Sequence, residues 1–181
     1  MSLDRILSMN LHKHLDQVRS LCERGEWERV NELIDNKPEL TNYVDEHDEG
    51  VLHVVASFAG SRSSIEKLIL LGADVNQESK EGETPLTVSI LAGSYIGLDS
   101  LAETRCLLDN GADPNKVGPS GNRPMQWALI HNRIPHLKLL VDYNADPQLK
   151  TIDLQPEDSY QIAHEYGIDL RSILAAAHSN Q

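Results

Sequence analysis

The chain has 181 residues, of which 40% are hydrophobic and 4% aromatic, and its formal net charge is -12. This length allows one domain with a sizeable buried core. The negative charge disfavours nucleic acid and anionic membranes as partners and favours a basic protein, although it also fits a role in solubility alone.

The distribution of apolar residues predicts a cytoplasmic protein that does not bind membranes. No apolar run approaches the ~18 residues that span a bilayer, and the N-terminus lacks the apolar region of a secretory signal. Both cysteines, Cys22 and Cys106, fall among apolar residues in helical patterns. We therefore expect buried, reduced thiols rather than a disulfide or a metal site.

Residues 11–40 are expected to form a pair of helices. Apolar residues from Leu11 onward recur at helical spacing, and Gly25 interrupts them. A second apolar face begins at Trp27, and Lys37-Pro38 ends it, because the residue before a proline is driven out of the helical region.

The segments 45–77, 78–115 and 116–148 share a pattern that identifies them as repeats. The sequence Gly-Ala-Asp-x-Asn occurs at Gly72–Asn76 and Gly111–Asn115, and Asn144–Pro147 is a weakened copy. Asn144 replaces glycine at a helix end, and asparagine is the best substitute there because it tolerates left-handed geometry. The best helix start is Gly82–Leu86, in which a threonine hydroxyl can cap the helix and a proline follows at its first position.

Two segments depart from this pattern. The second repeat is longer than the others by an insertion at Ser94–Ser100, which is expected to be a loop or an extended helix. Residues 156–177 are predicted to form a last helix pair, which begins at Pro156–Asp158 and is interrupted at Gly167. This pair lacks the Gly-Ala-Asp motif that ends the repeats.

These motifs resemble the ankyrin repeat family. The resemblance implies an all-α solenoid of stacked helix pairs with short hairpin loops, which we call fingers, projecting between them. It also implies a single domain over residues 1–181, with three repeats between degenerate caps at 11–40 and 156–177. His53 matches the family's motif histidine, which ties the loops of neighbouring units together. Thr87 and Gln126 stand at the corresponding positions of the next two repeats.

Motifs for catalysis, cofactors and metals are missing from the sequence. We find no glycine-rich phosphate loop, no Gly-x-Ser-x-Gly and no His-Glu-x-x-His. The acidic run Asp45–Glu49 lacks the spacing of a calcium loop, and His12 and His14 read as a solvated helix end. We therefore expect no enzyme activity, no cofactor and no metal.

The resemblance implies that the fingers and first helices form a concave side that contacts a protein. The finger tips would present one group of polar residues: Glu46, His47, Glu49, Lys80, Glu81, Glu83 and Asn122. The exposed sides of the first helices would present a second group: Phe58, Leu91, Ile130 and His131. An apolar centre with a charged rim is typical of an interface, but neighbouring fingers could instead cover some of the apolar side chains.

The function expected from these features is non-enzymatic binding of a protein, possibly basic in character, through the concave groove by a monomeric chain. An alternative is an inhibitor or immunity-type protein that neutralises a basic partner such as a toxin. A third reading is an accessory subunit that completes the site of an enzyme.

Overall fold

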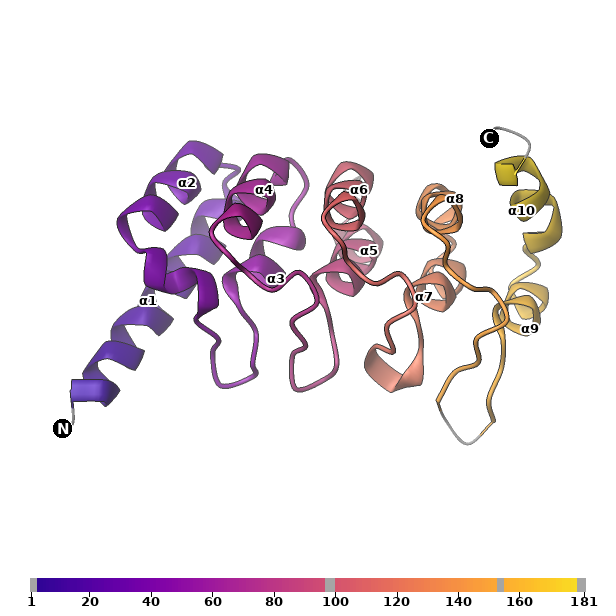
Figure 1. Ribbon diagram of the computed structural model, residues 1–181, viewed down its shortest axis with the longest axis horizontal. Coiled ribbons are helices and arrows are strands. Elements are labelled where there is room, and N and C mark those ends of the chain that lie inside the picture. Colours follow the sequence, from indigo (N-terminus) through magenta and orange to yellow (C-terminus); the bar gives the residue numbers. More distant parts are fainter. Residues whose placement is uncertain (1–2, 97–99, 153–154, 179–181) are drawn as a thin grey trace.

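The computed structural model describes residues 3–96, 100–152 and 155–178. Helix pairs stack side by side into an elongated solenoid, and loops project from one side of the stack (Figure 1). The first helices of the pairs are α1 (Leu3–Glu23), α3 (Val51–Ala56), α5 (Pro85–Ile96), α7 (Pro124–Ile130) and α9 (Ser159–Glu165). The second helices are α2 (Trp27–Asn36), α4 (Arg62–Leu70), α6 (Leu101–Asp109), α8 (Ile134–Asp142) and α10 (Leu170–His178).

In the first four pairs each helix packs on its partner, and corresponding helices of successive pairs pack on one another, so the solenoid has two layers. In the first layer α1 contacts α3, α3 contacts α5, α5 contacts α7 and α7 contacts α9. Short 3₁₀ turns, η1 (Pro38–Asn42) and η2 (Pro119–Gly121), lie between pairs. The described residues form no strand beyond one isolated bridge between Val44 and Gly50. The all-α solenoid predicted from the sequence is confirmed.

A continuous apolar core runs along the stack because no single helix pair can bury its own apolar face. Leu15 of α1, Leu68 of α4, Leu107 of α6 and Leu140 of α8 are each 0–1% exposed and belong to one cluster. Both cysteines lie in this core as free thiols, as predicted. Burial raises the pKa of Cys22 to about 12 and that of Cys106 to about 11.

The first helices of the repeats begin with three different caps. The Thr84 hydroxyl accepts a hydrogen bond from the Thr87 N–H at 3.2 Å, as the sequence predicted. Gly50 has no side chain, and its N–H instead donates to His53 Nδ1 at 3.3 Å. In the third repeat the Arg123 N–H donates to Gln126 Oε1 at 2.8 Å. Each start therefore satisfies a backbone donor that a bare helix end would leave without a partner.

The Gly-Ala-Asp-x-Asn motif links each repeat to the next. Asn76 Oδ1 accepts from the Asp113 N–H at 2.8 Å, and Asn76 Nδ2 donates to the Gly111 carbonyl at 3.0 Å. Asn115 makes the same two contacts one repeat later, to Asp146 N and Asn144 O. The motif asparagine therefore connects successive helix ends.

Asn144 adopts the left-handed conformation that its position requires. Its φ angle is +62°, compared with +94° at Gly72 and +89° at Gly111. The asparagine can adopt this geometry because its short polar side chain tolerates positive φ better than other residues do. The predicted equivalence of the three helix ends is confirmed.

The ends of the solenoid differ in detail from the sequence prediction. The first helix begins at Leu3 rather than Leu11, and its N-terminal part extends beyond the stack towards the level of the fingers (Figure 1). The helix expected to start at Pro156–Asp158 starts at Ser159. Asp158 is its cap, accepting from the Tyr160 and Gln161 N–H groups at 3.0 Å each.

The insertion at Ser94–Ser100 lies partly outside the described residues, because 97–99 are not described. Its first part continues α5 to Ile96. Its last residue, Ser100, is 1% exposed, and its hydroxyl donates to the Ser89 carbonyl. The same hydroxyl lies 3.2 Å from His136 Nε2, so the end of the insertion is anchored in the interior.

No helix in the described part of the chain is both long enough and apolar enough to cross a membrane.

Candidate functional site

Hairpin fingers follow one another along one side of the solenoid, as Figure 1 shows. We number them by residues: the first finger is 43–50, the second 77–84, the third 116–123 and the fourth 149–158, of which 153–154 are not described. Each is closed by a backbone hydrogen bond, from Asp45 to Glu49, Ser79 to Glu83, Gly118 to Asn122 and Thr151 to Glu157. The fourth finger was missed by the sequence analysis. A Gly-Ala-Asp-like finish at Asn144–Pro147 was the available signal, because a finger follows each of the other two finishes.

The first finger is held in shape by its own carboxylate. Asp45 Oδ1 accepts from the His47 N–H at 2.8 Å and from the Glu49 N–H at 3.0 Å. Asp48 at the turn has a φ angle of +57°. These bonds hold the turn so that the Glu46 and His47 side chains point outward. The Glu46 side chain is 82% exposed and that of His47 is 63% exposed.

The second finger binds directly to the first through Lys80. The Lys80 N–H donates to the His47 carbonyl at 2.8 Å, and Lys80 Nζ donates to the Glu46 carbonyl at 2.7 Å. The one cation predicted at these two tips therefore contacts backbone oxygen rather than a carboxylate. Its contacts hold the two tips side by side.

Carboxylates gather on these two fingers. Glu81 is exposed, whereas Glu83 is half-buried. Desolvation, followed by the negative charges of Glu49 and Glu81, raises the pKa of Glu83 above its usual value. The acidic groups of both fingers therefore act on one another electrostatically.

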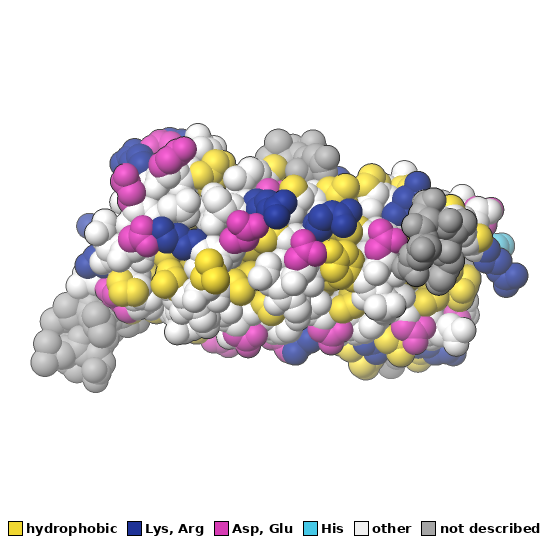
Figure 2. Space-filling view, turned by 45° about the horizontal axis from the view of Figure 1, so that its top comes forward, with side chains coloured by type: hydrophobic (Ala, Val, Ile, Leu, Met, Phe, Trp, Pro, Cys, Tyr) yellow, Lys and Arg dark blue, Asp and Glu magenta, His cyan; other side chains and the backbone are white. Residues whose placement is uncertain are grey.

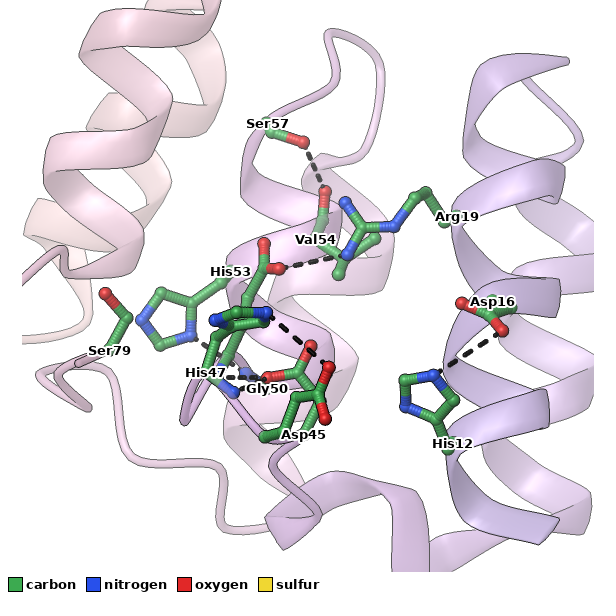
Figure 3. A network of polar contacts seen from close by, with 12 residues as sticks. His12, Asp16, Arg19, Asp45, His47, Gly50, His53, Val54, Ser57 and Ser79 are labelled. Carbon is green, nitrogen blue, oxygen red and sulfur yellow. Dashed lines mark hydrogen bonds and ion pairs between the residues drawn. The ribbon is translucent and has the colours of Figure 1, made fainter. Parts of the chain in front are cut away.

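Arg19 of α1 pairs with one carboxylate of this acidic group, and the sequence analysis missed it. Its Nη2 atom lies 3.0 Å from Glu49 Oε2 (Figure 3). Because both side chains are partly exposed, the ion pair adds little stability, but it links α1 to the first finger. No sequence pattern connects positions 30 residues apart.

The opposite face has a different charge pattern. Figure 2, in which the second helices come forward, shows acidic and basic side chains interspersed over them. Pairs there include Lys67 with Asp35 and Arg62 with Glu66. Local pairing neutralises much of the charge on this face.

The apolar residues predicted for the groove differ in exposure. Phe58 and Ile130 are half-buried and pack against the core. Leu91 is only 7% exposed, so its expected exposure was wrong. It lies in the middle of α5, a helix that packs against α3, α6 and α7, although Leu91 is not a member of the main core cluster. His131 stacks on Trp127 with ring centroids 5.6 Å apart, and Asn122 closes the third finger.

A hollow of about 450 Å³ lies where the first finger faces α1. We call it the end groove, and it is lined by Met9, His12, Tyr43, Val44, Asp45 and Glu46. Figure 3 shows two residues of its lining, His12 on α1 and Asp45 on the first finger, with the groove between them. The sequence analysis had read His12 only as part of a solvated helix end.

His53 connects the first repeat to the second finger. Its Nδ1 atom accepts from the Gly50 N–H, so Nε2 carries the proton and donates to the Glu83 carbonyl at 3.1 Å. The side chain is 1% exposed, and desolvation lowers its pKa below 6.5. These contacts confirm the structural role that the resemblance implied for His53, which is to tie the loops of neighbouring repeats together.

We expect His53 to make stability depend on pH. Its folded pKa is below its unfolded pKa, so the unfolded state binds more protons between the two values. Stability therefore rises with pH through that window and falls as pH drops below 6.5. Changing His53→Gln should flatten this dependence, because a glutamine side chain does not titrate. The variant should keep its fold, since Gln126 already makes the corresponding contacts in the third repeat, to Arg123 N, Leu149 O and Glu157 O.

Urea midpoints of both proteins between about pH 7.5 and pH 5 measure this difference. The remaining histidines and carboxylates contribute equally to both curves. Identical slopes for wild type and variant would contradict the prediction.

Comparisons with known proteins agree with the architecture. A family model described as ankyrin repeats (3 copies) matches residues 52–151. An ankyrin repeat protein of fowlpox virus (strain NVSL) is 37% identical over 76 residues, which are 41% of this chain and 12% of that protein. One from Acanthamoeba polyphaga mimivirus is 32% identical over 106 residues, which are 58% of this chain and 62% of that protein. The match therefore spans less than two thirds of either relative.

Proposed function

Because this chain belongs to the ankyrin repeat family, we propose that it binds a basic protein through the acidic tips of its first two fingers. Ankyrin repeats are generally protein–protein interaction modules, and the family is generally non-enzymatic. Fold alone does not identify a partner, so the proposal depends on the surface of this particular chain.

The grouping of carboxylates on two adjacent fingers carries the proposal. Glu46 and Glu81 are exposed, and Glu49 and Glu83 lie beside them, half-buried. Lys80 Nζ donates to the Glu46 carbonyl rather than to one of these carboxylates. Arg19 already pairs with Glu49, and His47 lies 3.8 Å from the Glu46 carboxylate. A basic partner would supply cations to Glu81 and Glu83, would add to those at Glu46, and would also be steered towards the tips in solution.

Apolar contacts would complete such an interface. Phe58 lies two residues after α3 and Ile130 is the last residue of α7, and both are half-buried. Asn122 and His131 belong to a less acidic third repeat. The partner would therefore place its basic residues on the first two fingers and its neutral or apolar residues further along the solenoid. Such charge complementarity raises the rate of association and also favours the correct partner over others.

Neutralising the tips should abolish most of the binding. We expect a variant with Glu46, Glu49, Glu81 and Glu83 changed to glutamine to bind at least about tenfold more weakly at low salt. The partner is first captured from lysate with the wild-type chain and identified by mass spectrometry. Its affinity for each variant is then measured at low and high salt.

A matched control removes the same charge from exposed acids away from the fingers. The control changes these residues to amides: Glu28, Glu32, Asp142 and Glu165. We expect it to bind like the wild type, apart from a small general effect of net charge. Equal weakening in both variants, or capture that does not respond to salt, would overturn the proposed role of the tips.

A further inference from the structure

We propose that the end groove is the docking site for an extended, basic segment of the partner, which occupies the place that a neighbouring finger takes elsewhere in the row. This proposal rests on the proposed function, because it assumes a basic protein partner. It goes further by assigning the segment's conformation, its location and the backbone group that binds it.

The contacts between fingers follow a rule. In each finger one residue donates its backbone N–H to the hydrogen bond that closes the finger. The next residue donates its own N–H to the tip of the preceding finger. Lys80 donates to the His47 carbonyl at 2.8 Å, and Ile152 donates to the Gly121 carbonyl at 2.9 Å. In the third finger this position is Pro119, which has no N–H to donate.

Glu46 occupies this position in the first finger, because it follows Asp45, the donor of the hydrogen bond that closes that finger. Within the part of the chain that the structure describes, the Glu46 N–H has no hydrogen-bond acceptor. No finger precedes the first one in the described residues, and the end groove lies on that side. The first finger therefore ends the row with an unused backbone donor, as an edge strand ends a sheet.

The dimensions of the groove suit a short extended segment. Its volume of about 450 Å³ falls within the range of roughly 300–1,000 Å³ that ligand pockets span. Met9 is 58% exposed, and Tyr43 and Val44 are half-buried, so the walls offer apolar area. A contiguous apolar patch rimmed by polar residues is typical of contact sites.

The charge of the groove selects a basic occupant. Asp45 and the 82% exposed Glu46 line its finger side. On the α1 side, His12 Nε2 lies 3.9 Å from Asp16 Oδ2 (Figure 3), so that ring already faces a carboxylate. An extended segment places alternate side chains on opposite sides. It can therefore direct lysines at Glu46 and apolar residues at Met9 while one of its carbonyls accepts from the Glu46 N–H.

The test uses a defined probe, a capped peptide of about eight residues that alternates lysine and valine. A peptide alternating glutamate and valine is the control. Amide signals of the isotope-labelled chain are followed by NMR during titration. We expect the Glu46 amide to shift with the lysine peptide alone, and its hydrogen exchange to slow.

Two variants at one position separate the backbone donor from the charge. Glu46→Pro removes both the N–H and the carboxylate, and Pro119 shows that a finger accepts proline at this position. Glu46→Gln keeps the N–H and removes only the carboxylate. We expect the dissociation constant of the lysine peptide to rise about tenfold in the first variant and about threefold in the second. Circular dichroism confirms that both fold.

Other outcomes would overturn the docking site. If amides of the second finger shift and Glu46 does not, the proposed function survives and the end groove is wrong. If no finger amide shifts, both fail. If sedimentation shows a dimer whose Glu46 amide is protected without peptide, the occupant is a second copy of the chain. Binding of Glu46→Pro as tightly as wild type would also refute the proposal.

Discussion

Replacing Gly121 by alanine is expected to lower the free energy of unfolding by more than about 3 kcal/mol. A Cβ atom at this position would lie 2.3 Å from the Ile152 carbonyl oxygen and 2.7 Å from its carbon. Both atoms are backbone, so no side-chain rotation can relieve the overlap. The φ angle of +77° adds strain for any residue with a side chain. The fourth finger would have to move away from the third.

Gly111→Ala is the matched control for this change. Its φ angle is +89°, and a Cβ atom there would meet nothing within 4 Å. It should therefore cost only the backbone strain, about 1–2 kcal/mol. Urea denaturation of the two variants and the wild type measures both effects. Equal losses would show that the contact between Gly121 and Ile152 is not needed for stability.

Truncating Leu68 to alanine is expected to cost about 3–4 kcal/mol. The Leu68 side chain is fully buried in α4 and belongs to the continuous core. Its removal leaves a cavity between helix pairs, because neighbouring side chains can only partly collapse into the space. Interfaces between repeats carry much of the stability of a solenoid, so the whole domain should respond.

Leu70→Ala makes the same chemical change in the same helix, where the side chain is 87% exposed. We expect a change within about 0.5 kcal/mol. Thermal or urea unfolding of both variants provides the comparison. A similar loss at both positions would contradict the assigned face of α4.

The residues of the repeat motifs predicted their own local structure well. Thr84, Pro85, Gly111 and Asn144 behave as their chemistry requires, because caps and left-handed helix ends depend on neighbours within a few residues. Exposure was less predictable. Leu91 lies in a helix packed against others on several sides, and the helical period alone does not say which neighbours cover a residue.

Some members of the candidate site could not be found from the sequence at all. Arg19 meets Glu49 only because α1 packs on α3, and Lys80 meets Glu46 only because two fingers lie side by side. The sequence marked Glu46 and Lys80 as tip residues. It did not indicate that the lysine donates to backbone oxygen rather than to a carboxylate.

The amino-acid sequence by itself determined that this protein is a stack of helix pairs whose first two fingers are acidic, since period, caps and net charge are local or additive properties. The folded chain decided which carboxylates share one surface, that a fourth finger packs against Gly121, and that the Glu46 N–H lacks an acceptor among the described residues. These features arise from contacts between residues about 30 or more positions apart, and such contacts exist only once the repeats have stacked.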